Sequence, residues 1–248
     1  MKFKIFVINL DSSLDRLSSM QEQCDRLGLE FERVSAVRGS ELSEGDKSKI
    51  YSLEQNLKKY DKVLNDGEIG CYLSHIRCWE KLLAEELDYA LVLEDDGILT
   101  DELPLFITKL AKSFEHWDYI LLSHGRKIKP VIDSLDMGDG LWLQKVLKLN
   151  STTTGQFISF QGAKKLVSTA LPISRPVDMD IQHWFEKSLR CFVVSPFPVL
   201  TGDFSSDISI AGDRRFVQKR PFKRIWQKIR FEVMLLLNRN QLPDLPSK

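Results

Sequence analysis

Short apolar runs alternate along this chain with longer segments in which apolar residues recur at helical spacing. The first run, residues 4–10, leads into a segment that ends at Gly28 and whose apolar face consists of Leu14, Leu17, Met20, Cys24 and Leu27. Brief continuous apolar runs bounded by polar turn residues indicate buried strands, whereas recurrence every three to four residues indicates an amphipathic helix. Alternation of the two patterns predicts an α/β fold.

The same patterns place further elements along the chain. Strands are expected at residues 30–37, 89–93, 118–123, 141–149 and 191–194, and a strand–turn–helix unit at residues 152–166. A helix is expected from Asp66 onward, with an apolar stripe of Ile69, Leu73, Ile76, Trp79 and Leu83. Residues 43–66 are expected to form short helices and loop, and residues 131–140 a loop.

The most informative run is residues 89–96, where five uncharged residues lead directly into the carboxylates of Glu94, Asp95 and Asp96. In open α/β sheets, ligands bind at the carboxyl ends of the strands. Three acids at one strand end repel one another unless a cation lies among them, and Mg²⁺ and Mn²⁺ prefer carboxylate oxygens together with substrate phosphates. The run therefore indicates a metal–diphosphate site, with a solvated acidic turn as the simpler alternative.

Two kinds of chemistry fit this acidic run. A nucleotide-sugar transferase would use it to hold a metal ion against a diphosphate. A HAD-like phosphatase would use an aspartate nucleophile in a D-x-D-G-x-L pattern, which residues 94–101 loosely match. The nucleophile position of that pattern holds Glu94, which is one methylene longer than aspartate, and the run lies behind two predicted strand–helix units. The phosphatase interpretation is therefore disfavoured.

Four other polar residues are candidates by position alone. Asn9 and Arg16 flank the junction between the first strand and its helix, and a helix N-terminus after a strand can bind anions or nucleotides. Ser74 and His75 lie on neighbouring faces of the next long helix. All four also have structural interpretations, since this junction opens most α/β domains and a lone histidine on a helix is more often structural than catalytic.

Composition limits the class of protein. The 248 residues, 43% of them hydrophobic and 28% charged, suit one globular domain with a sizeable core, or one domain with an appendage. The formal net charge is zero, so no global charge favours nucleic acid, and the 4 cysteines form no CxxC pair, which favours reduced thiols. Residues 1–10 contain too short an apolar run for a secretory signal, and no stretch has the roughly 20 apolar residues of a membrane span, so a cytoplasmic protein is expected.

Taken in order, these segments resemble glycosyltransferase family 25, which includes lipooligosaccharide galactosyltransferases and collagen galactosyltransferase-like enzymes. The matching segments are residues 7–10 with Arg16, residues 67–75, residues 93–96, residues 155–159 with Gly162 and Ala163, and residues 176–178. The match covers residues 3–210 of the chain. No one segment would suffice for this resemblance, but the ordered set is specific.

The resemblance implies a GT-A-like fold, that is, a Rossmann-like mixed sheet flanked by helices, over residues 1–212. It also implies an inverting hexosyltransferase that takes galactose from UDP-galactose and forms a β linkage, expected to be β-1,4. The implied acceptor is a lipooligosaccharide, a lipopolysaccharide or another glycan, which includes the possibility of a lipid-linked oligosaccharide. A non-catalytic sugar-binding or scaffold protein is the alternative from another class, because an intact set of residues does not prove turnover.

The resemblance further assigns roles to individual residues. Asp96 with Glu94 would bind the divalent metal, with Mn²⁺ expected ahead of Mg²⁺. Asp178 would be the catalytic base and Asp180 the second choice, although either also suits a helix cap. Donor contacts are expected from Asn9, Leu10, Arg16, Ser74, His75, Glu94 and Asp95, and acceptor contacts from Thr154, Gly155 and Gln156.

These roles are consistent with the chemistry of sugar transfer. Departure of a nucleoside diphosphate leaves negative charge, which a cation held by carboxylates neutralises as it develops. The attacking hydroxyl needs a base on the opposite face of the sugar, so the base should be separate in sequence from the metal cluster.

The last part of the chain, residues 213–248, has a different character. Its basic residues include Lys219, Arg220, Lys223, Arg224, Lys228 and Arg230, with Trp226 and other apolar residues at helical spacing. A basic amphipathic helix with aromatic residues is typical of an interfacial membrane anchor, here expected on the inner face of the cytoplasmic membrane. The alternatives are a helix packed on the catalytic domain and, less favoured, a nucleic-acid patch.

Overall fold

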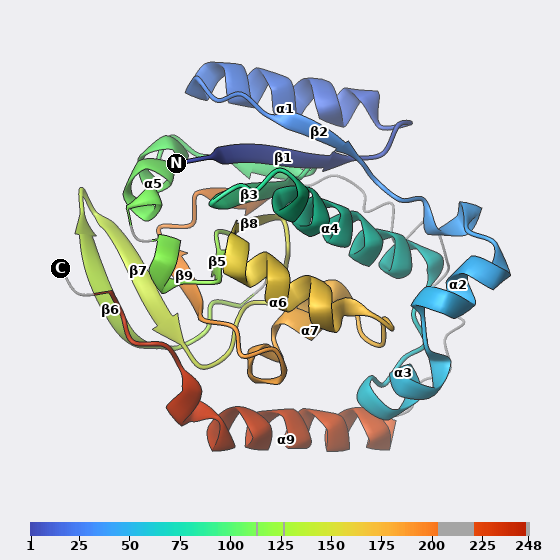
Figure 1. Ribbon diagram of the computed structural model, residues 1–248. Helices are drawn as coiled ribbons and strands as arrows, with labels where there is room; N and C mark the ends of the chain where they lie inside the picture. Colours follow the sequence, from blue (N-terminus) through green and yellow to red (C-terminus); the bar gives the residue numbers. More distant parts are fainter. Residues whose placement is uncertain (113, 126, 203–220, 247–248) are drawn as a thin grey trace.

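The computed structural model describes residues 1–112, 114–125, 127–202 and 221–246 (Figure 1). Its strands are β1 (Phe3–Asn9), β2 (Glu32–Ser35), β3 (Tyr89–Glu94), β4 (Gly97–Leu99), β5 (Tyr119–Leu121), β6 (Val131–Gly138), β7 (Leu141–Val146), β8 (Gly155–Ser159), β9 (Cys191–Ser195) and β10 (Val199–Thr201). The α-helices are α1 (Leu14–Leu27), α2 (Glu44–Ile50), α3 (Leu53–Lys59), α4 (Asp66–Ala84), α5 (Leu103–Ala111), α6 (Phe160–Ala170), α7 (Val177–Ile181) and α9 (Pro221–Leu237). Short 3₁₀ helices are η1 (Gly39–Glu41), η2 (Phe114–His116), η3 (Trp184–Glu186) and η5 (Arg239–Gln241).

Eight strands form one mixed sheet in the order β2-β1-β3-β8-β5-β9-β7-β6, and β4 pairs with β10 in a separate two-stranded sheet. Strands β2, β1 and β3 run parallel, whereas β8 is antiparallel to both β3 and β5. The parallel strands β1 and β3 are neighbours, so their carboxyl ends meet at one edge of the sheet. The expected Rossmann-like mixed sheet flanked by helices is confirmed.

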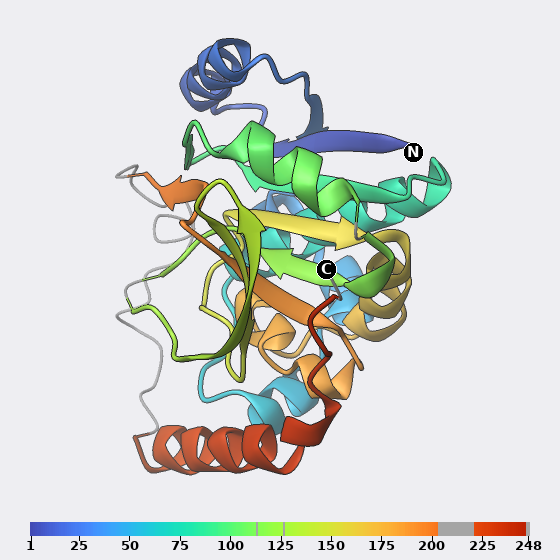
Figure 2. The ribbon, with the colours of Figure 1, turned by 90° about the vertical axis from the view of Figure 1, so that its left-hand side faces the viewer.

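Helices cover both faces of this sheet (Figures 1 and 2). Phe6 and Ile8 of β1 belong to the core cluster under α4 and α6, whereas Ile5 and Val7 belong to the cluster under α1 and α5. Successive side chains of a strand point to opposite faces, so a continuous apolar run is buried on both sides. This explains why the strand patterns of the sequence are continuous rather than alternating.

One expected loop is instead a strand. Residues 131–140, predicted as a loop, contribute β6 to a hairpin with β7, and the turn carries left-handed backbone at Asp139 and Gly140. Most of the β6 side chains are exposed, so the strand has no buried apolar run to mark it. The strand expected at 141–149 is confirmed as β7, although it ends at Val146.

The N-terminal end of α4 is fixed by two local devices. Asn65 and Glu68 form a reciprocal capping box around the first turn. Gly39 and Gly70 then let the η1 loop touch α4, because a Cβ atom on Gly39 would lie 1.8 Å from the Asp66 carbonyl oxygen and one on Gly70 would lie 2.3 Å from that of Val37. The loop after β2 is thereby held against the helix beside the carboxyl ends of β1 and β3.

Helix α9 lies along the lower side of the molecule in Figures 1 and 2. It docks on the domain through Phe231 and Leu235, which are buried, and through an ion pair between Glu232 and Lys148. No helix in the described part of the chain is long and apolar enough to cross a membrane. The predicted domain boundary at residues 212–213 and the predicted membrane residues Lys219 and Arg220 lie outside the described residues.

Candidate active site

The acidic triplet stands where β3 ends, and the geometry of the strand sends its carboxylates to different sides. Side chains alternate along β3, so Glu94 points to the α4 face while Asp95 points to the α1 face. Asp95 and Asp96 form the turn that leads from β3 to β4. One short run of sequence therefore supplies acids to both sides of the sheet edge.

Glu94 is held by a buried network. The Nε2 atom of His75, on α4, lies 2.9 Å from the Glu94 carboxylate, and the Thr153 hydroxyl donates to the same oxygen at 2.6 Å. Because a carboxylate only accepts, His75 Nε2 carries the proton, and the amide nitrogen of Gln156 lies 2.9 Å from His75 Nδ1. Burial opposes ionisation of Glu94, but the hydrogen bonds from His75 and Thr153 outweigh it and keep its pKa below the ordinary value.

Asp95 is tied to the first strand and helix. Asn9, at the end of β1, donates to Asp95 at 2.7 Å, and Arg16 of α1 lies 3.5 Å from the other carboxylate oxygen. Burial raises the pKa of Asp95, and the contacts with Asn9 and Arg16 oppose that rise. Asn9 is itself buried and also accepts from Arg33, so its side chain orients Asp95 rather than facing the cavity.

Asp96 differs from both neighbours because its Oδ1 atom is buried without a hydrogen-bond partner among the described residues. Burial, followed by repulsion from Glu94 and Asp95, raises its pKa from 3.8 to about 7. An orphaned carboxylate oxygen beside two further acids suits a hard divalent cation, which would relieve the repulsion. The buried oxygen of Asp96 therefore fits the expected metal, and the ligand pair of Asp96 and Glu94 stays a prediction.

A second set of ligand atoms lies nearby, but its chemistry suits such a cation less well. One ligand atom from each of Cys71, His75 and Glu94 lies within 4.8 Å of the others. Burial raises the pKa of the Cys71 thiol well above its ordinary range, so it stays neutral, and the His75 nitrogen already donates to Glu94. A hard cation prefers oxygen to a neutral thiol.

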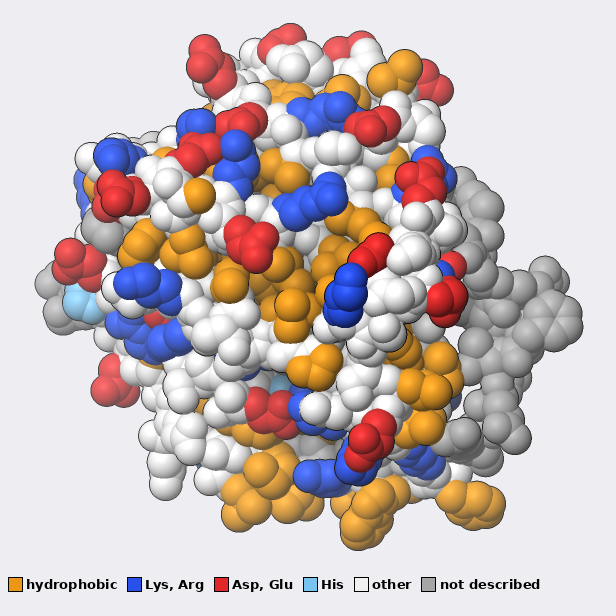
Figure 3. Space-filling model, turned by 45° about the vertical axis from the view of Figure 1, so that its right-hand side comes forward, with side chains coloured by type: hydrophobic (Ala, Val, Ile, Leu, Met, Phe, Trp, Pro, Cys, Tyr) orange, Lys and Arg blue, Asp and Glu red, His pale blue; other side chains and the backbone are white. Residues whose placement is uncertain are grey.

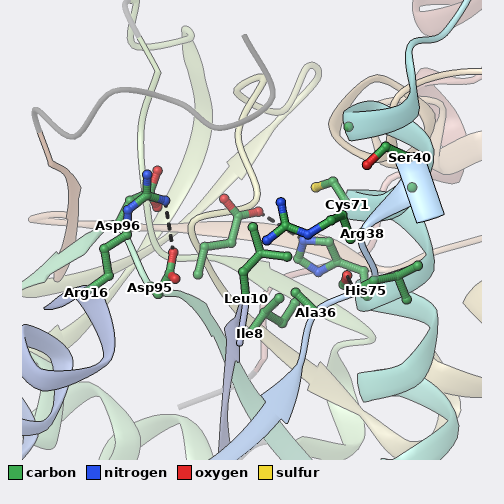
Figure 4. A pocket seen from close by; sticks show the side chains of 15 residues that line it. Ile8, Leu10, Arg16, Ala36, Arg38, Ser40, Cys71, His75, Asp95 and Asp96 are labelled. Carbon is green, nitrogen blue, oxygen red and sulfur yellow. Dashed lines mark hydrogen bonds and ion pairs between the residues drawn. The ribbon is translucent and has the colours of Figure 1, made fainter. Parts of the chain in front are cut away.

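The triplet lines a pocket that opens between β1, the loop after β2 and α4 (Figure 4). The pocket is lined by Ile8, Leu10, Arg16, Ala36, Val37, Arg38, Gly39, Ser40, Gly67, Cys71, Ser74, His75, Glu94, Asp95 and Asp96. In Figure 4, Arg16 and Asp96 lie on one side of the pocket, and Arg38, Cys71 and His75 lie on the other. Every predicted donor residue except Asn9 is part of this lining.

A wider cleft adjoins this pocket, and Glu94 and Cys71 line both. The cleft contains Asp178, from the first turn of α7, and Ser151, whose hydroxyl donates to the Asp178 carboxylate. Burial raises the pKa of Asp178, and the Ser151 hydrogen bond opposes the rise. Asp178 thus lies in the cleft, separated from the pocket of the acidic triplet by the residues that line both cavities. This is the position that a base would need.

Asp180 lies in a different environment from Asp178. Its carboxylate accepts a hydrogen bond from Tyr72 at 2.6 Å and pairs with Lys187 at 2.8 Å and with Arg175 at 3.2 Å. Burial favours the protonated acid, but the positive charge of Lys187 and the Tyr72 hydroxyl outweigh it and keep the pKa of Asp180 low. These contacts favour a structural role for Asp180 in holding α7 and η3 in place and leave Asp178 as the better candidate for the base.

The predicted acceptor residues are also displaced from the cleft. Thr154, just before β8, and Gly155 and Gln156, at its start, are buried, and Gln156 contacts His75. The cleft is lined instead by the two preceding residues, Thr152 and Thr153. The difference arises because β8 begins at Gly155 and carries the later residues into the sheet, while an acceptor role for this stretch stays a prediction.

Sequence reasoning missed several residues of the site. Arg38 lines the pocket from the loop after β2, and Ser151 and Thr153 bond the acids at the cleft. For Arg38 a signal existed, because a polar loop follows a predicted strand and parallel strands end at one sheet edge. For Ser151 and Thr153 none existed, since their partners are distant in the sequence.

Comparison with known proteins gives a consistent family. A model of the family described as glycosyltransferase family 25 (LPS biosynthesis protein) matches residues 2–181. A glycosyltransferase 25 family member from Aedes aegypti is 35% identical over an alignment that covers 84% of this chain and 37% of that protein. Procollagen galactosyltransferase 1-B from Xenopus laevis is 26% identical and aligns with 91% of this chain and 39% of its own length.

The chain therefore spans about two fifths of the length of these curated relatives. Among solved structures, it is similar to a glycosyltransferase involved in the glycosylation of the major capsid of PBCV-1, with 11% identity, a TM-score of 0.43 and coverage of 94% of this chain and 100% of the other. The family match runs from β1 through α7 and so includes the acidic triplet, its partners and Asp178. The chain belongs to glycosyltransferase family 25.

Proposed function

We propose that this chain is an inverting glycosyltransferase that moves a hexose from a UDP-sugar onto the hydroxyl of a glycan acceptor. The observation that carries the proposal is the shared wall at Glu94, which separates a pocket lined by the acidic triplet from a cleft containing Asp178. Two adjoining cavities, one suited to a metal-bound diphosphate and one containing a base, are what transfer between two substrates requires. The similarity to a procollagen galactosyltransferase makes galactose the first candidate sugar.

The acceptor and linkage are proposed on the same basis. One relative is named a procollagen galactosyltransferase, but the family is described as one of lipopolysaccharide biosynthesis proteins. We follow the family description and take a glycan of the lipooligosaccharide or lipopolysaccharide type as the first candidate acceptor. A β-1,4 linkage is the expected product. Inversion follows when the acceptor attacks from the face opposite the departing diphosphate, in one step.

The residues of the site divide the work. Asp178, oriented by Ser151, accepts the proton of the acceptor hydroxyl as its oxygen bonds to the anomeric carbon. The bond from that carbon to the diphosphate oxygen breaks, and its electron pair leaves with the diphosphate. A divalent metal held by Asp96 and Glu94 supplies positive charge to the leaving group when bound. Arg16 and Arg38, which line the same pocket, add fixed positive charge beside it.

Release of UDP tests this proposal. The purified protein is incubated with Mn²⁺ or Mg²⁺ and a panel of UDP-sugars, beside Asp96→Ala and a control, Glu22→Ala, on the exposed side of α1. Release from one donor that disappears with EDTA and in Asp96→Ala, but not in Glu22→Ala, is the expected result. If the protein neither releases UDP in the presence of a glycan acceptor nor binds UDP in calorimetry, the proposal is overturned in favour of a scaffold protein.

We also propose that α9 attaches the protein to the inner face of the cytoplasmic membrane. Phe231 and Leu235 dock the helix on the domain, while the opposite side exposes a second apolar stripe (Figure 3, lower edge). This stripe consists of Phe222, Ile225, Trp226, Ile229, Val233, Leu236 and Leu237, with Phe222 86% and Trp226 66% exposed. Lys228 and Arg230 are exposed on the same helix, so apolar insertion and attraction to anionic lipid would act together.

A further inference from the structure

Three lysines line the cleft that contains Asp178. Lys62 follows α3, and Lys127 and Lys129 come from the segment between β5 and β6, so two distant parts of the chain bring cations to one cavity. Lys62 and Lys127 are exposed and Lys129 is half-buried. Their ammonium groups therefore remain accessible to a ligand in the cleft.

These lysines differ from most others in the protein because they pair with no carboxylate among the described residues. Eleven lysines do form such pairs: Lys2, Lys4, Lys47, Lys49, Lys58, Lys81, Lys109, Lys145, Lys148, Lys165 and Lys187. The three acids that line the cleft are engaged elsewhere. Glu68 completes the α4 capping box, Glu94 is bonded by His75 and Thr153, and Asp178 is bonded by Ser151.

The positive charge extends from the cleft toward α9. Burial and the nearby charges of Lys148, Lys127 and Lys228 lower the pKa of Lys129, and only Glu232 opposes them. Glu232 is already paired with Lys148. Lys129 thus lies among cations that repel it, and neither Lys127 nor Lys129 is paired with a carboxylate among the described residues, so a bound anion would stabilise this group.

We propose that the acceptor carries a phosphate group and that Lys127 and Lys129, assisted by Lys62, bind this phosphate while the acceptor hydroxyl faces Asp178. The inference rests on the proposed transfer reaction and adds the chemical class of its acceptor. The phosphate has two sources that share this chemistry: a phosphorylated glycan in solution, or a lipid-linked phosphate presented beside α9. Lysine suits either, because its ammonium binds phosphate as a compact point charge.

Calorimetry with a soluble hexose phosphate tests the site directly. Glucose 6-phosphate is titrated into the protein with UDP and Mn²⁺ filling the donor pocket, and glucose is the uncharged comparison. The wild-type protein should bind the phosphate ester at least about tenfold more tightly than glucose, and Lys127→Gln/Lys129→Gln should lose about tenfold of that affinity. Lys112→Gln/Lys164→Gln removes two exposed charges elsewhere and should leave the affinity unchanged.

A second arm uses vesicles of phosphatidylcholine with phosphatidic acid, which presents a lipid phosphate. Binding that weakens in Lys127→Gln/Lys129→Gln but not in the control pair identifies a lipid source, whereas a loss confined to glucose 6-phosphate identifies a soluble glycan. If the two pairs behave alike toward both probes, the phosphate site is overturned. Failure of the wild-type protein to bind UDP would instead count against the proposed transferase. The phosphate site is judged separately, by comparing Lys127→Gln/Lys129→Gln with the control pair.

Discussion

Glu94, Asp95 and Asp96 are neighbours in sequence, yet each meets a different environment at the end of β3. Glu94 is kept ionised by His75 and Thr153, and Asp95 is bonded by Asn9 and Arg16. Of these three acids, only Asp96 keeps a buried carboxylate oxygen without a hydrogen-bond partner among the residues that the structure describes. The first two acids are thus positioned by protein, and the third is left for a ligand.

Replacing Asp96 by asparagine should stabilise the metal-free protein in a pH-dependent way. The pKa of Asp96 rises from 3.8 to about 7 on folding, so wild-type stability is lost as the pH rises from the lower value through the higher one. Asn cannot ionise and avoids this loss, which amounts to at most about 4 kcal/mol. Urea unfolding in EDTA should show Asp96→Asn more stable than wild type at about pH 8, with the gain greatly reduced at about pH 4. A gain of equal size at both pH values would contradict the assignment.

Asp178→Asn should abolish most transfer without affecting the donor. Loss of a general base lowers turnover by about 10² to 10⁴-fold, whereas UDP affinity should remain that of wild type. Because burial raises the pKa of Asp178, the wild-type rate should also increase as the pH rises through that raised value. UDP release and calorimetry measure both effects, with Asp139→Asn in the exposed β6–β7 turn as control. Near-normal transfer by Asp178→Asn with UDP bound would remove Asp178 from the mechanism.

At the scale of elements, the pocket depends on the contact between η1 and α4. Gly39 and Gly70 let backbone touch backbone there, and this contact holds the loop that carries Arg38 beside the carboxyl ends of β1 and β3. The contact uses no side chain, so its tolerance for added volume is small. The shape of the donor pocket is therefore set by packing away from the acids.

Gly70→Ala should weaken both stability and UDP binding. Its Cβ would lie 2.3 Å from the Val37 carbonyl oxygen and 2.7 Å from the Gly39 nitrogen, so backbone must move, at a cost of about 1–3 kcal/mol. Gly45→Ala, in helix α2, is the matched control, because its nearest atom is 3.7 Å away. Thermal unfolding and UDP calorimetry check the pair. Equal effects of the two substitutions would mean that the close approach does not shape the pocket.

The elements could be predicted from the sequence where burial leaves a pattern. The apolar runs of β1, β3 and β5 and the stripe of α4 were visible because those faces are buried. Strand β6 was missed because most of its side chains are exposed, so no apolar run marks it. It is held in the sheet by its backbone pairing with β7.

The site was predictable only in its local part. Residues 94–96 can be recognised in the sequence because they directly follow a buried strand. They line the pocket together with Leu10, Arg16, Ser74 and His75. Partners such as Thr153 are separated from the acids by many residues of chain, and only the sheet order brings them together. The choice between Asp178 and Asp180 likewise depended on tertiary contacts, since both follow the same proline.

At the scale of the whole molecule, α9 is a helix with two apolar sides. One side docks on the domain through Phe231, beside His183, and through Leu235. The other side carries the stripe that begins at Phe222. One helix could therefore serve both functions raised by the sequence, because it packs on the domain with one side and leaves the other side available to a membrane.

The outer stripe of α9 should control binding to anionic vesicles. Trp226→Glu/Ile229→Glu places two acids in that stripe and should reduce co-sedimentation with phosphatidylglycerol vesicles by about tenfold or more, because apolar insertion and attraction are both lost. Leu14→Glu/Leu105→Glu, which alters exposed residues of α1 and α5, should bind as wild type does. Unchanged binding of the α9 variant would refute the membrane proposal.

The docking of α9 carries a geometric consequence for the choice of acceptor. Because Phe231, Leu235 and the Lys148–Glu232 pair fasten the helix to the domain, a lipid surface that held the outer stripe would also fix the height and tilt of the whole enzyme. The cleft of Asp178 would then stand at one set distance above the bilayer. Such an enzyme would select acceptors by length. It would act on a glycan whose chain between the lipid and the terminal sugar matches that distance, and it would not act on shorter or longer ones.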